Sequence, residues 1–114
     1  MTMKKIDIRN RTLSSENGEY VLGLEDTGSH ACYMIYGILK PGEKGRLIKP
    51  GKGHEEIILA IKGDLALTGD ISGRLEQGSA FHLVGKRSAF LENTGSDEAV
   101  YVIAGGHSAH DHQH

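Results

Sequence analysis

Short apolar runs bounded by glycine are the feature that most limits what this chain can fold into. The 114 residues include 16 glycines and only 2 prolines. Turn pairs separate the apolar runs, among them Asn17-Gly18, Pro41-Gly42, Lys62-Gly63 and Thr94-Gly95. No window of ten or more residues carries a 3.6-residue apolar stripe, so we expect little helix. The pattern predicts an all-β sandwich or barrel, because many short, closely spaced strands are typical of those folds.

We predict nine strands within a single domain. They cover Lys5–Arg9, Glu19–Leu24, Ala31–Leu39, Arg46–Ile48, Glu56–Ile61, Asp64–Thr68, Ala80–Val84, Ser88–Glu92 and Ala99–Ala104. A chain of this length has room for one core, which we place in residues 1–104. No large apolar residue follows Ala104, so residues 105–114 are predicted to form a flexible His-rich tail.

Charge and composition exclude several classes of protein. With 13 Lys and Arg against 15 Asp and Glu, the net charge is −2, which does not indicate binding to nucleic acid or to a membrane surface. No apolar stretch is long enough to span a bilayer, and the N-terminal residues lack the apolar core of a signal peptide. A single cysteine, Cys32, excludes an internal disulfide. We therefore expect a cytoplasmic protein.

The segment Pro50–Asn93 resembles the two motifs of the cupin superfamily. Glu56 and Gly63 have the Glu-to-Gly spacing of the first motif, and Gly78 and Asn93 fit the two ends of the second. The resemblance implies a jelly-roll β-barrel of two antiparallel sheets, often a homodimer, with a ligand pocket at one end between the sheets.

Most metal-ligand positions of that family are held here by residues that do not bind metal. In the same register, the family's histidines fall on Pro50, Lys52 and Ala89, and only the carboxylate, Glu56, is kept. An ammonium group at Lys52 would repel a cation and could hold an anionic ligand if it pointed inward. If the glycine-rich loop turns Lys52 to solvent, this position indicates no ligand.

Strand alternation places Lys52, His54 and Glu56 on one face, and these are our candidate ligand-binding residues. His54 and Glu56, with His82 as a third ligand, would form a rebuilt site for Zn, Ni, Fe or Mn. The alternative that we favour has His54 bonded to the adjacent carboxylate at the pocket mouth and His82 at the surface or in a dimer contact. Glu56 could also bond backbone amides, or pair with Lys52 or Lys86.

Four histidines lie in the last eight residues: His107, His110, His112 and His114. A tail of this kind can chelate Zn²⁺, Ni²⁺ or Cu²⁺ loosely, since imidazole suits all three ions. It could equally be a solvated end without a role, or part of a purification tag.

Cys32 and Asn93 are two further residues that could have either a chemical or a structural role. Cys32 and His30 share a strand face and could ligate metal or form a nucleophile pair, but we favour Cys32 as a small buried hydrophobe. Asn93 precedes Thr94-Gly95, so we expect its side chain to serve a turn.

These observations predict a small cupin-domain protein that binds a small polar or anionic ligand, or a metal ion, at the barrel mouth. One alternative is a metal-dependent enzyme of isomerase or dioxygenase type with the rebuilt ligand set. Catalytic non-haem sites usually keep two or more histidines around an open position, which favours the binding protein. A second alternative is a metal-handling protein that works through its His-rich tail.

Overall fold

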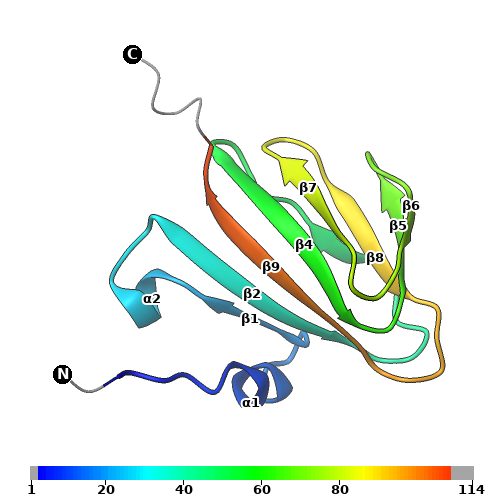
Figure 1. The fold of residues 1–114 in the computed structure, drawn as a ribbon, viewed down its shortest axis with the longest axis horizontal. Coiled ribbons are helices and arrows are strands. Elements are labelled where there is room, and N and C mark those ends of the chain that lie inside the picture. The colour runs from blue at the N-terminus through cyan, green and yellow to red at the C-terminus, as the bar shows by residue number, and fades with distance from the viewer. Residues whose placement is uncertain (1–2, 109–114) are drawn as a thin grey trace.

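Two antiparallel sheets form the fold of residues 3–108, which a computed structural model describes (Figure 1). The larger sheet has the order β1-β2-β9-β4-β7, with strands Glu19–Leu22, Cys32–Leu39, Ala99–His107, His54–Lys62 and Ala80–Val84. The smaller sheet has the order β3-β8-β5-β6, with strands Arg46–Ile48, Ala89–Asn93, Leu65–Gly69 and Gly73–Leu75. Helices are short, α1 at Ile8–Leu13 and α2 at Leu24–Thr27. The predicted all-β class with two antiparallel sheets is confirmed.

The N-terminal strand predicted over Lys5–Arg9 is wrong, because helix α1 begins there at Ile8. Asp7 caps this helix, and its carboxylate accepts the backbone N–H of Asn10 at 3.1 Å. An aspartate that satisfies an otherwise unpaired N–H favours a helix start. The short strand β6 was not predicted, since three residues are too few to show an alternating pattern.

Strand β9 is longer than predicted. We expected it to end at Ala104, but it continues to His107, so residues 105–107 belong to the larger sheet and not to the tail. In this extension Gly106 lies opposite Cys32, and His107 lies opposite His54. The other tail histidines, His110, His112 and His114, lie outside the described residues.

The core fills the space between the two sheets. Strand β4 shows the alternation that builds it: Glu56, Ile58 and Ala60 face inward and are buried, whereas Ile57 and Leu59 face outward. The buried hydrophobic cluster comprises Leu39, Ile48, Ile58, Ala60, Leu65, Leu67, Leu75, Leu83, Ala89, Leu91, Ala99, Tyr101 and Ile103. Each large apolar side chain buried here contributes about 1.5–3 kcal/mol to the free energy of unfolding. Neither helix in residues 3–108 has the length and apolar content needed to cross a membrane.

Two tyrosines lie across glycines of the neighbouring strand. A Cβ atom on Gly37 would lie 2.0 Å from Cζ of Tyr101, its partner across the β2–β9 pair. A Cβ on Gly105 would lie 2.2 Å from Cζ of Tyr33 in the same strand pair. These glycines are therefore required by the close approach of an aromatic ring, and they let both tyrosines lie on the inner surface of the larger sheet.

Arg46 joins the two sheets through a nearly buried guanidinium group, whose side chain is 10% exposed. It donates hydrogen bonds to Oη of Tyr101 at 2.8 Å and to the carbonyl of Ile38 at 3.2 Å. It also pairs with the carboxylate of Glu43 at 3.0 Å. Tyr101 in turn donates to Glu19. Because Arg46 starts β3 and its partners lie on or beside the larger sheet, this network connects the two layers.

Candidate functional site

Four polar side chains meet on the inner face of the larger sheet, at the end where β4 begins and β9 finishes. We call Tyr33, His54, Glu56 and His107 the mouth group. Strand register brings them together, since His54 lies opposite His107, and Gly105 lies between Glu56 on one side and Tyr33 on the other. Because residues two apart on a strand share a face, the sequence-predicted pair His54 and Glu56 does lie on one face.

The Glu56 carboxylate has Tyr33 as its partner. Glu56 is only 5% exposed, and Oη of Tyr33 donates to its Oε2 at 2.5 Å. Burial raises the pKa of Glu56, and the bond from Tyr33 offsets part of that rise. Burial and the same bond also raise the pKa of Tyr33, so the phenol keeps its proton and remains a donor at neutral pH. No local pattern indicated this partner, because Tyr33 lies 23 residues away from Glu56 on another strand.

His54 lies half-buried at the edge of the mouth group. Its ring centre is 6.1 Å from that of Tyr33 and 4.9 Å from that of His107. Nδ1 of His54 faces the carbonyl of Lys52 at 3.3 Å, and Nε2 of His107 faces the carbonyl of His30 at 2.9 Å. Each imidazole is therefore oriented by a backbone carbonyl.

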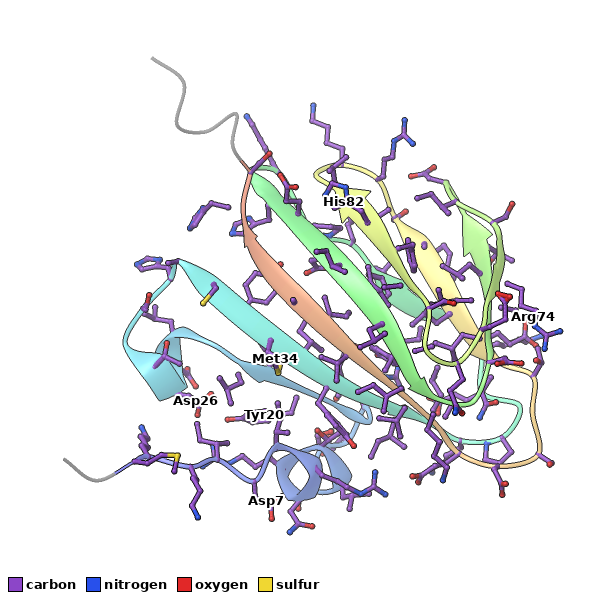
Figure 2. The ribbon with its side chains drawn as sticks, viewed as in Figure 1. Asp7, Tyr20, Asp26, Met34, Arg74 and His82 are labelled. Atoms are coloured by element: carbon purple, nitrogen blue, oxygen red, sulfur yellow. The ribbon has the colours of Figure 1, made fainter. Side chains whose placement is uncertain are left out.

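The structure does not bring His82 to this group. His82 lies on β7 opposite Ile57, so its side chain points from the outer face of the sheet, where Nε2 is 2.7 Å from Oε1 of Glu55 (Figure 2). The flanking Leu83 is buried in the core, which puts His82 on the opposite face by strand alternation. Within residues 3–108, no group of three or more His, Cys, Asp and Glu side chains is arranged to hold a metal ion.

Lys52 is exposed in the turn that precedes β4, so it does not reach into the barrel. It lines a hollow of about 380 Å³ beside His54, which we call the basic hollow. The lining residues are Lys52, Gly53, His54, Val84, Gly85, Lys86, Arg87 and Ser108. Backbone hydrogen bonds hold its two loops together, from Gly51 N to Gly85 O at 3.0 Å and from Gly85 N to His54 O at 2.9 Å. Lys86 and Arg87, which sequence reasoning did not select together with Lys52, complete this positively charged site.

The interpretation of Cys32 as a core residue is wrong, because Cys32 is exposed. Cys32 shares the outer face of β2 with Met34, which is also exposed (Figure 2). His30 precedes β2, so the strand face predicted for His30 and Cys32 is not formed. The prediction for Asn93 is confirmed. Its buried amide donates to the carbonyl of Asp97 at 2.8 Å, and its Oδ1 accepts the N–H of Gly95 at 2.9 Å.

Comparison with solved structures places this architecture among known folds. An oxalate oxidase, solved in complex with the substrate analogue glycolate, matches with a TM-score of 0.67 and 24% identity over 82% of this chain and 53% of that chain. A sugar phosphate isomerase of the cupin superfamily from Silicibacter pomeroyi matches with a TM-score of 0.61 and 18% identity, over 91% and 67% of the two chains. This chain has the cupin fold. A cupin domain of a transcriptional regulator from Enterobacter cloacae also matches, with a TM-score of 0.64 and 18% identity over 80% and 98% of the chains.

These neighbours establish the cupin fold and leave the activity open. The chain spans about half the length of the oxalate oxidase that it matches, 53% of that chain. No family model matches the sequence. No curated protein matches it either. The cupin neighbours include enzymes and a domain of a regulator, so function has to be argued from the residues at the mouth of this barrel.

Proposed function

We propose that this cupin-fold protein binds a small anionic molecule in the basic hollow at the barrel mouth. The observation that supports this proposal is the composition of the lining: Lys52, Lys86 and Arg87 gather around His54, and none of residues 3–108 that line the hollow is acidic. Cations collected in one concave site attract an anion more strongly than single surface charges do.

The chemistry of the hollow suits a carboxylate or a phosphate. A guanidinium group such as that of Arg87 can bind either group through two parallel hydrogen bonds, and a lysine adds a point charge. The glycines Gly53 and Gly85 have no side chain to keep a ligand from the backbone. A volume of about 380 Å³ lies at the small end of the range for ligand pockets, which favours a small molecule.

The metal-dependent enzyme alternative has less support. The residues at the family's ligand positions do not fit a metal ion, since Pro50 and Ala89 offer no donor side chain and Lys52 offers a cation. The retained carboxylate, Glu56, is nearly buried and bonded to Tyr33. We therefore derive no metal chemistry at those positions.

Titration of ¹⁵N-labelled protein with glycolate and, separately, with inorganic phosphate tests the proposal. We expect saturable NMR shifts of the backbone amides of Gly53, Gly85 and Arg87 with at least one of the two anions. Arg87→Ala should weaken binding about tenfold or more, because removal of a charge-assisted contact costs about 1.5–3 kcal/mol. Lys44→Ala is the matched control, since Lys44 is exposed and lines a different hollow. An equal loss in both variants, or no saturable shift with either anion, would contradict the proposal.

We also propose that the outer face of the larger sheet packs against a second copy of the chain. We call Met34, Ile57, Leu59 and Ile61 the outer apolar face. Ile57 is 52% exposed and Ile61 is 46% exposed, which is unusual for large hydrophobic residues that neighbour one another.

Charge at the two ends of β4 favours a second copy as the occupant. Glu55 lies at one end of the outer apolar face and Lys62 at the other. A two-fold axis between the copies, parallel to the sheets and perpendicular to the strands, would place Glu55 of one copy over Lys62 of the other. Such an arrangement is self-complementary, as an isologous dimer requires.

A further inference from the structure

Val84 gives the basic hollow an apolar wall. It is the last residue of β7 and is 41% exposed, and it lines the hollow together with Lys52, Lys86 and Arg87. Lysine and arginine side chains also carry methylene stems below the charged group, and these stems can contact an apolar ligand. The hollow therefore combines positive charge with carbon surface, and a ligand that fills it meets both.

Several backbone N–H groups around the hollow already have partners within the protein. Four of them donate to backbone carbonyl groups at distances of 2.9 to 3.1 Å. They belong to His54, Gly85, Arg87 and Ser108. Protein sites for a phosphate group commonly direct several backbone N–H groups at its oxygens. These four groups do not serve that purpose here, so the anion is bound by side chains, which favours a carboxylate.

The hollow is larger than an isolated anionic group. A water molecule takes about 30 Å³ in the liquid, so the five non-hydrogen atoms of inorganic phosphate need roughly 150 Å³. The hollow has a volume of about 380 Å³. A ligand that fills it has roughly ten non-hydrogen atoms on the same measure, and the atoms beyond its charged group lie against Val84.

Two carboxylates of β4 lie near the hollow, and each is bonded to another side chain. Oε1 of Glu55 is 2.7 Å from Nε2 of His82 on the outer face. Oε2 of Glu56 accepts the hydroxyl of Tyr33 inside the core. Among residues 3–108, neither carboxylate lines the hollow. The charge that a ligand meets there is therefore set by the two lysines and Arg87.

We propose that the ligand of the basic hollow is a short-chain carboxylate, whose charged group binds Arg87 and the two lysines and whose apolar chain packs on Val84. This inference rests on the proposed anion site. A guanidinium group binds a carboxylate through two parallel hydrogen bonds. Each methylene group of the chain raises the affinity about twofold, since complete burial of a methylene corresponds to roughly fourfold and the hollow is open to water on one side.

A chain-length series on the natural protein tests the ligand class. NMR titrations with acetate, butyrate, hexanoate and inorganic phosphate give the four dissociation constants, followed at the backbone amide of Gly85 and the methyl groups of Val84. We expect the affinity to rise about fourfold for each pair of added methylene groups, and hexanoate to bind about tenfold more tightly than phosphate. Hexanoate should shift the Val84 methyl signals more than acetate does.

Variants separate the charged group of the ligand from its chain. Val84→Ser removes the apolar wall, and it should lower the affinity for hexanoate about fivefold or more while that for acetate changes less than about twofold. Arg87→Ala should weaken all three carboxylates by a similar factor, because they share the charged group. Val21→Ser is the matched control and should change none of these affinities. Val21 is 52% exposed, and its strand β1 lies at the opposite edge of the larger sheet from β7.

The outcomes distinguish this inference from the proposed anion site. Saturable binding of phosphate or acetate, without a gain from a longer chain, would overturn the short-chain carboxylate and support the anion site. No saturable binding of any of the four anions would overturn both. If hexanoate shifts the methyl signals of Ile57 and Leu59 and not those of Val84, the chain lies on the outer apolar face and the inference is wrong.

Discussion

Oη of Tyr33 lies 2.5 Å from Oε2 of Glu56. This hydrogen bond gives each of the two polar groups a partner at the mouth end of the core. A buried carboxylate without a donor would be costly, because burial penalises its charged form. The tyrosine can take this position only because Gly105 on the next strand leaves room for its ring. Three residues from three strands thus keep the Glu56 carboxylate beside the apolar side chains of the core.

Removal of the tyrosine hydroxyl tests this bond. Tyr33→Phe should lower the free energy of unfolding by about 1–3 kcal/mol, since it leaves the Glu56 carboxylate without its donor. Urea unfolding measures the loss. Tyr36→Phe is the control, because the Tyr36 hydroxyl is bonded to the exposed Arg9, and a change of less than about 1 kcal/mol is expected there. Equal losses in the two variants would contradict the role given to Tyr33.

The glycine below each tyrosine ring should tolerate no side chain. Gly105→Ala places a Cβ atom 2.2 Å from the Tyr33 ring, so either the ring or the strand must move, at a cost of about 1–3 kcal/mol or more. Gly106→Ala, the next residue of β9, places its Cβ 3.3 Å from the nearest atom and should cost less. In the double variant Tyr33→Ala with Gly105→Ala, the effects should be clearly non-additive. Additive effects, measured by the same unfolding experiment, would rule out the ring contact as the cause.

Arg46 should matter far more to stability than an exposed arginine. Arg46→Ala removes a nearly buried cation from Tyr101, Glu43 and the carbonyl of Ile38, and should cost about 3–5 kcal/mol. Arg74→Ala also breaks an ion pair, with Asp64, but Arg74 is 70% exposed, so the loss should be below about 1 kcal/mol. Thermal unfolding of both variants measures the difference. A loss below 1 kcal/mol in both would show that Arg46 does not join the sheets.

Low pH should weaken the hydrogen-bond network around Arg46, because protonation of Glu43 removes the charge that pairs with the guanidinium group. Burial opposes ionisation of Glu43, but the hydrogen bonds from the Lys40 N–H and from Arg46 lower its pKa overall. A carboxyl group whose pKa is lower in the folded state stabilises the fold above its unfolded pKa of about 4.3, and this contribution is lost as the pH falls through the lower folded value. Glu43→Gln should therefore be less stable than the natural protein at pH 7, and the difference should shrink towards pH 3. A difference that stays constant with pH would contradict the assignment.

A charge on the outer apolar face should separate the proposed dimer. Leu59→Lys should give a sedimentation mass near one chain of 12.3 kDa, whereas the natural protein should sediment near twice that mass. Phe90→Lys is the control, because Phe90 is 40% exposed but lies on the smaller sheet, opposite Leu47. If the natural protein sediments as a single chain at micromolar concentration, the proposed dimer is contradicted. A Phe90→Lys variant that dissociates as readily would place the interface elsewhere.

Alternation and turn residues predicted much of the sheet structure, because both act over a few neighbouring residues. The bounds of β3 and β7 agree with the prediction, and Asn93 serves its turn as expected. The prediction for Cys32 was wrong for a physical reason: alternation states which residues share a face, but not which of the two faces meets the core. For the same reason the sequence left open which face His82 points to. The fold places it on the outer face, beside Glu55.

The sequence by itself determined that short strands separated by glycines form an all-β sandwich or barrel, and that His54 and Glu56 share one strand face. Only the tertiary structure decided which groups meet at the barrel mouth. Tyr33 reaches Glu56, and His107 reaches His54, because the register of β2, β9 and β4 aligns residues that are 23 and 53 positions apart. Register depends on packing between whole strands, and a shift of one residue turns every side chain to the other face. For this reason the all-β class and the shared face of His54 and Glu56 could be predicted from local patterns, while the positions of Tyr33 and His107 beside them could not.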